Sequence, residues 1–312
     1  MMLLVRSAMP ILTLIAFSYN ASAKNCGGNV PCVCGDRVTS SYKLTGDLVC
    51  NGNVGLTIAG NGVYLDGLTP DNKTYTISRA QRPTNKDVYG ILIADGTHSA
   101  IIANVTITGF ARGIHIQNSK NNLIVKTALV DNGYDRDASG KVIKPAGYGI
   151  DLAKGASNNY IVNNLIQNNF DEGIHLGTGS AGTGNLIQAN IFANNGEENI
   201  YILDSPQTKI IDNHVSGARQ NSMYIKHSSD CIISKNHIFN KPIALEGNSD
   251  RNKLTDNTIS GAAIILATNG GLYPDNNVLS GGTYTPFSNC TLIKQRFDKF
   301  GHGNRYEHLP CQ

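Results

Sequence analysis

A self-similar pattern runs through most of this 312-residue chain. A polar residue that opens a short apolar run recurs at near-constant spacing. Six of the seven intervals between successive members lie between 20 and 26 residues, and the seventh is 37. Repeats of this length indicate a solenoid, in which each repeat buries its apolar face only against its neighbours. The members of this column are Asn104, Thr127, Asn164, Asn190, Asn213, Asn236, Asn257 and Asn277.

Each repeat contains short runs of alternating apolar residues separated by turn residues, and no amphipathic helical stretch interrupts them. The pattern predicts an all-β fold, a single-stranded right-handed parallel β-helix. A buried Asn amide can hydrogen-bond to its copy one coil away, which satisfies polar groups at the turns. The right hand follows from the preference of parallel crossovers.

The repeats from Tyr89 to Leu279 resemble the right-handed parallel β-helix superfamily, the pectate-lyase-like group with PbH1 repeats. The segment from Cys32 to Cys50 resembles the N-terminal cap of many secreted members. The superfamily contains polysaccharide lyases, C5-epimerases, glycosidases, a periplasmic copper-maturation family and non-catalytic members. The resemblance therefore implies a fold but no single activity.

The chain divides into four predicted segments. Residues 1–23 read as a signal peptide, with Arg6 in the positive region, an apolar run from Pro10 to Phe17, and a small-residue cleavage site that ends at Ala23. The apolar run is too short to span a bilayer. We expect an N-terminal cap over 24–55, β-helix repeats over 56–285 and a C-terminal cap over 286–312, in a secreted or periplasmic protein.

All seven cysteines follow the predicted signal peptide, as expected for an oxidising compartment. We expect two bridges within the first four, with their pairing left open, a Cys290–Cys311 bridge, and a free Cys231. A four-cysteine zinc site is the alternative at the front. The first four are Cys26, Cys32, Cys34 and Cys50.

The strand that follows each Gly-Ile-type turn has inward-facing Ile, Leu or Met on both sides of one outward residue. Adjacent members of this outward column should lie about 4.8 Å apart, the spacing of neighbouring strands. The middle five are polar or aromatic, which favours a ligand groove over an ordinary solvated sheet face. In chain order the column is Leu92, His115, Asp151, His175, Tyr201, Tyr224, Ala244 and Ile265.

Charged residues flank this column two positions before the first inward residue and just after each strand. Together with the outward column they form the predicted groove. The predicted substrate-binding residues are Arg112, His115, Asp151, Lys154, Glu172, Asp204 and His227.

The long interval locates an insertion at 131–147, which should overhang the groove beside His115 and Asp151. Within it, Asp135, Asp137 and Ser139 resemble the start of a calcium loop, although position 146 lacks the expected glutamate. Ca²⁺ at these three residues is the cofactor that this motif suggests.

The groove residues favour a polyuronate lyase or a C5-epimerase. Such chemistry needs a cation to neutralise the uronate carboxylate, a base for the C5 proton and an acid near the leaving oxygen. Arg112 or Lys226 suits the role of the cation. Lys226 or His175 suits that of the base, and Tyr201 or Tyr224 that of the acid. The Asp-Pro-His-Asp/Glu motif of mannuronan epimerases is absent.

Two other classes remain open. Paired carboxylates would support hydrolysis, and six are available: Asp151, Asp171, Glu172, Glu197, Glu198 and Asp204. A non-catalytic carbohydrate-binding or structural protein is also compatible, as is a metal-binding one similar to the copper-maturation family, with His115, Asp151 and His175 as ligands.

The balance of 26 basic and 23 acidic side chains disfavours a nucleic-acid partner. No later stretch approaches membrane-spanning length. The groove residues indicate an acidic polysaccharide as the partner, and we expect the protein to be a monomer.

Overall fold

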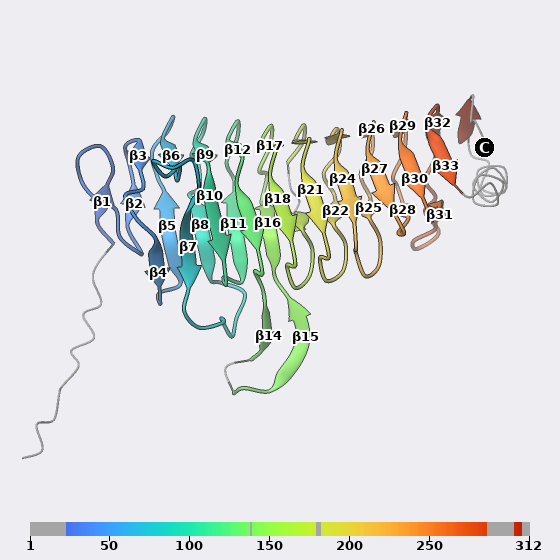
Figure 1. The fold of residues 1–312 in the computed structure, drawn as a ribbon. Coiled ribbons are helices and arrows are strands. Elements are labelled where there is room, and N and C mark those ends of the chain that lie inside the picture. Colours follow the sequence, from blue (N-terminus) through green and yellow to red (C-terminus); the bar gives the residue numbers. More distant parts are fainter. Residues whose placement is uncertain (1–22, 138, 179–181, 286–302, 308–312) are drawn as a thin grey trace, which may run out of the picture.

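The computed structural model describes residues 23–137, 139–178, 182–285 and 303–307. The chain winds into a right-handed parallel β-helix with three long parallel sheets (Figure 1). The predicted fold class is confirmed. No helix in the described ranges is long and apolar enough to cross a membrane.

The sheet that carries the outward column is called the groove sheet. Its strands, in spatial order, are β1 (Asn25–Cys26), β2 (Arg37–Val38), β5 (Val54–Ile58), β8 (Tyr89–Ile93), β11 (Arg112–Gln117), β16 (Tyr148–Ala153), β19 (Ile174–Thr178), β22 (Ile200–Leu203), β25 (Met223–Lys226), β28 (Ile243–Glu246) and β31 (Ile264–Ala267).

The second sheet precedes the groove sheet in each coil. Its strands are β4 (Leu48–Cys50), β7 (Tyr75–Arg79), β10 (Val105–Thr108), β13 (Ala128–Val130), β18 (Leu165–Gln167), β21 (Ile191–Ala193), β24 (His214–Ser216), β27 (His237–Phe239), β30 (Thr258–Ser260) and β33 (Thr283–Thr285).

The third sheet follows the groove sheet in each coil. Its strands are β3 (Tyr42–Lys43), β6 (Tyr64–Asp66), β9 (Ile101–Ala103), β12 (Leu123–Val125), β17 (Tyr160–Val162), β20 (Leu186–Gln188), β23 (Lys209–Ile211), β26 (Ile232–Ser234), β29 (Lys253–Thr255), β32 (Val278–Ser280) and β34 (Arg305–Glu307).

Columns of aliphatic residues fill the interior. In the groove sheet, Ile91, Ile114, Ile150, Ile174 and Ile200 pair in register and are fully buried. Strands paired at the same register place like side chains above one another, so every coil covers the apolar face of the next.

Asparagine ladders run along the turns, as predicted, but there are more of them than the sequence pattern indicated. In the ladder between the third and second sheets, Asn190 accepts bonds from the backbone and side-chain nitrogens of Asn164, and Asn213 accepts the same two bonds from Asn190. Two further ladders run through Asn122, Asn159 and Asn185 and through Asn132, Asn169 and Asn195.

Two of the eight predicted ladder positions are wrong. Asn104 lies one residue earlier than the ladder, in a left-handed conformation with φ 54° that Lys126 shares in the next coil. Asn277 belongs to a different ladder, where it accepts from Asn252 and donates to Asn304. Asparagine favours both left-handed corners and ladder sites, so the residue type alone does not separate the two.

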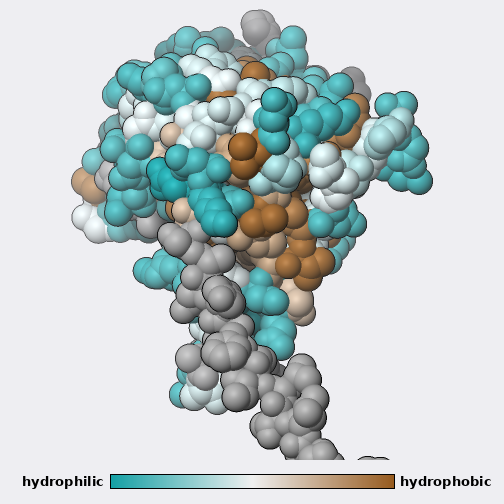
Figure 2. Space-filling view, turned by 90° about the vertical axis from the view of Figure 1, so that its left-hand side faces the viewer, coloured by the Kyte–Doolittle hydropathy of each residue, from teal (hydrophilic) through white to brown (hydrophobic). Residues whose placement is uncertain are grey.

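Two disulfides fasten the N-terminal end, Cys26–Cys32 and Cys34–Cys50, so the zinc alternative is wrong. Cys231 is free and buried, as predicted. The expected Cys290–Cys311 bridge and residues 1–22 of the predicted signal peptide lie outside the described residues. Apolar side chains are visible on the N-terminal end (Figure 2), where Val30, Val33 and Val49 are exposed.

The predicted insertion is an antiparallel hairpin formed by β14 (Tyr134–Arg136) and β15 (Val142–Ala146). It projects from the edge where the chain enters the groove sheet at β16 (Figure 1). At its tip, Asp137 Oδ1 accepts bonds from the backbone and hydroxyl of Ser139 and from the backbone of Lys141. These bonds account for the turn without an ion, and calcium at Asp135, Asp137 and Ser139 stays a prediction.

Candidate functional site

The predicted outward column is confirmed along its whole length. Each member pairs in register with the next, from Leu92 with His115 to Ala244 with Ile265. Alternation along each strand therefore places the five polar or aromatic members on one outer face.

Asp151 occupies the centre of this face and has no exposure to solvent. Its Oδ2 lies 2.9 Å from His115 Nδ1 and 3.2 Å from Arg112 Nε, and its Oδ1 lies 3.0 Å from His175 Nδ1. Burial alone would raise the pKa of Asp151, but the two imidazoles and the guanidinium hold it far below its usual range. Asp151 is therefore a carboxylate, and both Nδ1 atoms donate to it.

Aromatic rings enclose this hub. Tyr89 stacks on His115 with ring centroids 4.9 Å apart, and Tyr148 stacks on His175 at 4.4 Å. The Arg112 guanidinium carbon lies 5.7 Å from the ring centroids of both tyrosines. The rings and the carboxylate hold Arg112 in place.

A cleft of about 230 Å³ opens beside the hub. Basic side chains outnumber acidic ones in its lining, which suits an anionic group of a ligand. Its lining residues are Lys86, Asp87, Tyr89, Arg112, His115, Gln117, Ala153 and Lys154.

The next coils carry Tyr201 and Tyr224. Tyr201 stacks on His175 at 5.3 Å, and Tyr224 meets Tyr201 edge-on at 5.3 Å. Burial, followed by Glu172 and other carboxylates, raises the pKa of Tyr201 to about 12. Tyr201 therefore keeps its proton at neutral pH.

Lys226 and Tyr224 both contact Glu246 on the neighbouring strand. Lys226 Nζ lies 2.9 Å from Glu246 Oε1, the Tyr224 hydroxyl bonds Oε2, and Asn269 Nδ2 donates to Oε1 at 2.6 Å. Lys226 Nζ is thus held by a carboxylate of its own groove face, which suits a binding role better than that of a base.

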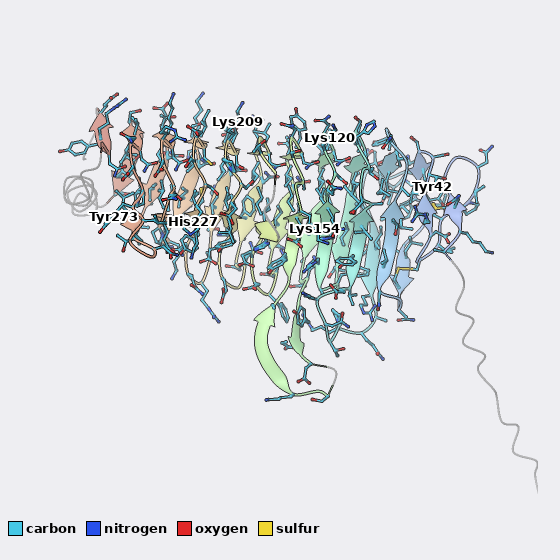
Figure 3. All side chains as sticks on the ribbon, turned by 180° about the vertical axis from the view of Figure 1, so that it is seen from behind. Tyr42, Lys120, Lys154, Lys209, His227 and Tyr273 are labelled. Atoms are coloured by element: carbon cyan, nitrogen blue, oxygen red, sulfur yellow. A yellow bond between two sulfur atoms is a disulfide. The ribbon has the colours of Figure 1, made fainter. Side chains whose placement is uncertain are left out.

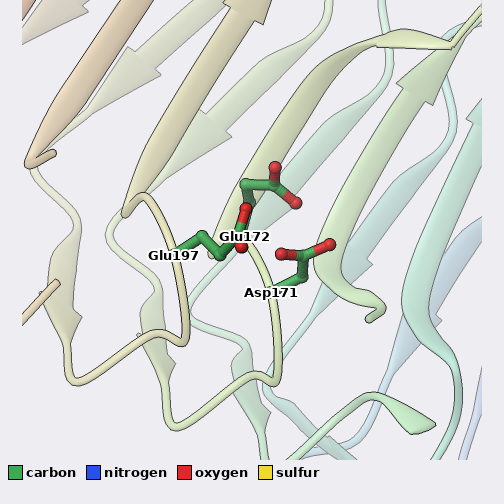
Figure 4. Close-up of side chains that lie close together, drawn as sticks. All are labelled: Asp171, Glu172 and Glu197. Carbon is green, nitrogen blue, oxygen red and sulfur yellow. The ribbon is translucent and has the colours of Figure 1, made fainter. Parts of the chain in front are cut away.

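Four carboxylates gather where two successive coils enter the groove sheet. Asp171, Glu172 and Glu197 offer ligand atoms that all lie within 4.8 Å of one another (Figure 4). Glu198 lies in the next coil at the position of Glu172 and accepts a bond from Asn221. Burial, then Asp171 and Glu198, raise the pKa of Glu172 to about 9.

Three predicted binding residues share a corner column after the groove strands. Lys154, Asp204 and His227 all adopt left-handed backbone conformations, with φ between 46° and 49°. Lys154 and His227 both lie along the lower part of the coils (Figure 3). Lys154 lines the basic cleft, whereas the His227 ring packs against Gly247.

His115, Asp151 and His175 do not form the metal-ligand set that one alternative required. Both imidazoles use Nδ1 to bind Asp151, and the one group of metal-ligand atoms within 4.8 Å in the described residues is the carboxylate group. The three residues instead form a hydrogen-bonded line across adjacent coils.

Sequence reasoning missed several members of this site. Tyr89 lies two residues before Ile91, in the same column as Arg112, and Glu246 pairs with Lys226. Both residues continue columns that repeat alignment already defines. Extending the column of Arg112 to the preceding coil and that of Lys226 to the following coil would have found them. The contacts of Glu246 with Lys226 and Tyr224 needed the structure.

Two family models match the chain. Residues 135–278 match the family described as periplasmic copper-binding protein (NosD), and residues 50–184 match the right-handed beta helix region. No curated protein matches the chain in a sequence search.

Solved structures share the fold at low identity. An alginate lyase from Paenibacillus sp. str. FPU-7 is 16% identical with a TM-score of 0.52, over 89% of this chain and 90% of the other. The Azotobacter vinelandii mannuronan C-5 epimerase AlgE4 A-module is 13% identical with a TM-score of 0.51, over 83% of both chains. The C387A mutant of DFA-IIIase from Arthrobacter chlorophenolicus A6 is 12% identical with a TM-score of 0.54, over 89% of this chain and 80% of the other.

These likenesses confirm the β-helix superfamily resemblance at the level of the fold. The two disulfides and the match to a periplasmic family favour an extracellular or periplasmic protein. Identities of 12–16% carry no residue roles to this chain.

Proposed function

We propose that this protein acts on an acidic polysaccharide that contains uronate units, by β-elimination or, with the same initial step, C5-epimerisation. The observation that carries the proposal is the Asp151 hub, which orients two imidazoles and a guanidinium on the outer face of the groove sheet. Two of the solved structures with this fold are an alginate lyase and a mannuronan C-5 epimerase, which supports this substrate class.

The proposed base is His175. Its Nδ1 donates to the Asp151 carboxylate, which fixes the orientation of the ring and assigns Nε2 as the nitrogen that takes the proton in this proposal. His175 is 11% exposed and His115 only 4%, so His175 is the imidazole that a bound sugar can reach more readily. We assign His115 to positioning Asp151.

The proposed acid is Tyr201. Its ring stacks on His175, and its raised pKa keeps the hydroxyl protonated at neutral pH. Tyr224, the other predicted acid, has its hydroxyl bonded to Glu246. Tyr224 and Lys226 therefore suit binding of a neighbouring sugar unit.

In the lyase reaction, His175 Nε2 takes the proton from C5, and the electrons of the C5–H bond form the C4=C5 double bond. The C4–O bond breaks, and the Tyr201 hydroxyl gives its proton to the leaving oxygen. Arg112 neutralises the carboxylate next to C5, which lowers the energy of the carbanion-like transition state. In epimerisation, the C4–O bond stays intact, and the Tyr201 hydroxyl gives its proton to the opposite face of C5 instead.

The test is to incubate purified protein with alginate, pectate, glucuronan and chondroitin, with and without calcium, and to follow ultraviolet absorbance of the unsaturated uronate. Exchange of C5 hydrogen for solvent deuterium, read by NMR, detects epimerisation. We expect one polymer to react. No elimination and no exchange with any of the four would contradict the proposal.

Tyr201→Phe should lower the rate about 100-fold or more, because a positioned acid contributes at least this factor. Tyr160→Phe is the matched control, since Tyr160 is exposed on the third sheet. Equal loss in both variants, or full activity of Tyr201→Phe, would remove Tyr201 from the mechanism.

Copper handling is the second candidate, favoured by the match of residues 135–278 to a periplasmic copper-binding family. The donors that the described ranges bring together do not fit copper. The group found there is made of carboxylates, whereas copper prefers imidazole, thiolate or thioether ligands. We therefore derive no step through copper.

A further inference from the structure

The carboxylate group at the entry to the groove sheet has no role in the proposed proton transfers. Asp171 and Glu172 lie in the turn before β19, and Glu197 lies in the turn before β22. The Glu197 backbone nitrogen donates to the Asp171 carbonyl at 2.9 Å, which stacks the two turns directly. Parallel coiling thus brings acidic side chains together from positions 26 residues apart.

Within this group, Glu172 carries the decisive observation. The residue is 7% exposed, and its Oε2 is buried without a hydrogen-bond partner. A buried carboxyl oxygen without a hydrogen-bond partner is costly, and the groups around it here are other carboxyl groups. The ligand-atom set that contains Glu172 is compact enough for one ion to contact three residues.

We propose that Asp171, Glu172 and Glu197 bind one hard divalent cation of the calcium class. Three carboxylates offer only oxygen ligands, which suit Ca²⁺, Mg²⁺ or Mn²⁺ rather than copper. Ca²⁺ takes oxygens at about 2.3–2.6 Å in flexible geometry, so two of its ligands lie at most about 5 Å apart. The observed limit of 4.8 Å meets this condition.

The site adjoins the residues that we assign to catalysis. Glu172 lies two positions before Ile174 and three before His175, and it contributes to the raised pKa values of Tyr148 and Tyr201. A cation here would turn an acidic stretch of the groove into one that accepts an anionic polymer. That consequence rests on the proposed function, whereas cation binding itself does not.

The experiment measures binding and stability without any polysaccharide. The protein is stripped with EDTA, and Ca²⁺, Mg²⁺, Mn²⁺ or Cu²⁺ is added in turn, with calorimetric titration and thermal unfolding as readouts. We expect one Ca²⁺ per chain and a Tm that rises by several degrees at saturating Ca²⁺, because the ion binds only the folded state. The same titration is then run on Glu172→Gln, Glu197→Gln and Asp212→Asn.

Glu172→Gln and Glu197→Gln should each weaken Ca²⁺ binding at least tenfold and remove most of the Tm rise. Asp212→Asn is the matched control, since Asp212 lies at a left-handed corner between the third and second sheets, where Asn is equally suited. Glu197 is partly exposed, so its variant guards against a folding defect in Glu172→Gln.

Several results would overturn the proposal. These are no hard-cation binding by the unmodified protein, equal Ca²⁺ binding by both glutamate variants, or a loss of Ca²⁺ binding in Asp212→Asn as large as theirs. Binding of Cu²⁺ alone would also overturn it. If Ca²⁺ binds as expected but no polymer reacts, the cation site stands and the proposed enzymatic function fails.

Discussion

The fully buried Asp151 carboxylate depends on side chains from two neighbouring coils. Arg112 and His115 come from the coil before it and His175 from the coil after it. Charges buried in this way are tolerated only when they are paired and hydrogen-bonded. The same contacts that stabilise the carboxylate also orient the two imidazole rings, so both stability and the proposed chemistry depend on Asp151.

Asp151→Asn should lower the free energy of unfolding at pH 7 by about 3 kcal/mol, because it leaves Arg112 buried without its counter-charge. The pKa of Asp151 is depressed in the folded state, so its stabilisation is present above the unfolded pKa of about 3.9 and declines as pH falls below it. Urea unfolding of both proteins between pH 7 and pH 2.5 tests this. A stability difference that stays constant down to pH 2.5 would contradict it.

At the scale of the element, the Asn ladders satisfy the buried polar groups of the turns, as backbone hydrogen bonds do inside a helix or a sheet. Asn190 accepts two bonds from Asn164 and donates to Ile161 O and Asn213 Oδ1. Each ladder amide satisfies backbone and side-chain groups in the coils on both sides. The turns between the sheets can therefore be buried with their polar groups hydrogen-bonded.

Asn190→Ala should cost about 3 kcal/mol of unfolding free energy, since it leaves buried donors and acceptors unpaired on two coils. Asn104→Ala should cost only about 1 kcal/mol, the penalty for an alanine in a left-handed conformation. Chemical denaturation of the two variants measures the difference. Equal losses would place Asn104 in the ladder after all.

The β14–β15 hairpin is an element that the coil does not need. A Cβ on Gly147 would lie 2.7 Å from Gly133 Cα, so the two ends of the insertion almost meet. Removal of residues 134–146, with Gly133 joined to Gly147, should keep Tm within a few degrees of the full-length value. The hairpin projects from the edge where the chain enters the groove sheet at β16, beside the Asp151 hub, so we expect polymer binding to weaken at least tenfold.

Thermal unfolding and a polysaccharide affinity gel would measure the two effects of this deletion. Retained polymer binding in the deletion variant would show that the hairpin is not part of the ligand surface. Unfolding at a much lower temperature would show that it is part of the solenoid core.

At the scale of the whole molecule, the solenoid makes stability local. Each coil contacts only its neighbours, so an end can loosen while the centre stays folded. Both described disulfides lie at the N-terminal end, and Cys34–Cys50 joins the turn before β2 to β4. The groove centre, β16 to β22, lies several coils away.

Replacing Cys34 and Cys50 by Ala should cost about 3 kcal/mol locally, the value expected for a loop of this length. Hydrogen exchange read by mass spectrometry should speed up in β1 to β5 and stay unchanged in β16 to β22. The Asp151 hub and any activity should persist. Equal acceleration along the chain would mean that the coils unfold as one cooperative unit.

The sequence alone was sufficient for the fold class, the free Cys231 and the full outward column from Leu92 to Ile265. These depend on alternation along a strand and on a repeated coil length, and both are local properties that a single chain displays directly. The insertion was placed for the same reason, because it interrupts the repeat.

Only the tertiary structure decided which side chains meet. Asn104 and Asn277 could not be excluded from the ladder by residue type. The roles of Asp151, Lys226 and Glu172 depend on the side chains that surround each of them, which the repeat pattern does not show. Which atom of a carboxylate faces which nitrogen depends on the rotamers and loop lengths of adjacent coils. The pKa values of these groups follow from those distances and from burial, which periodicity does not determine.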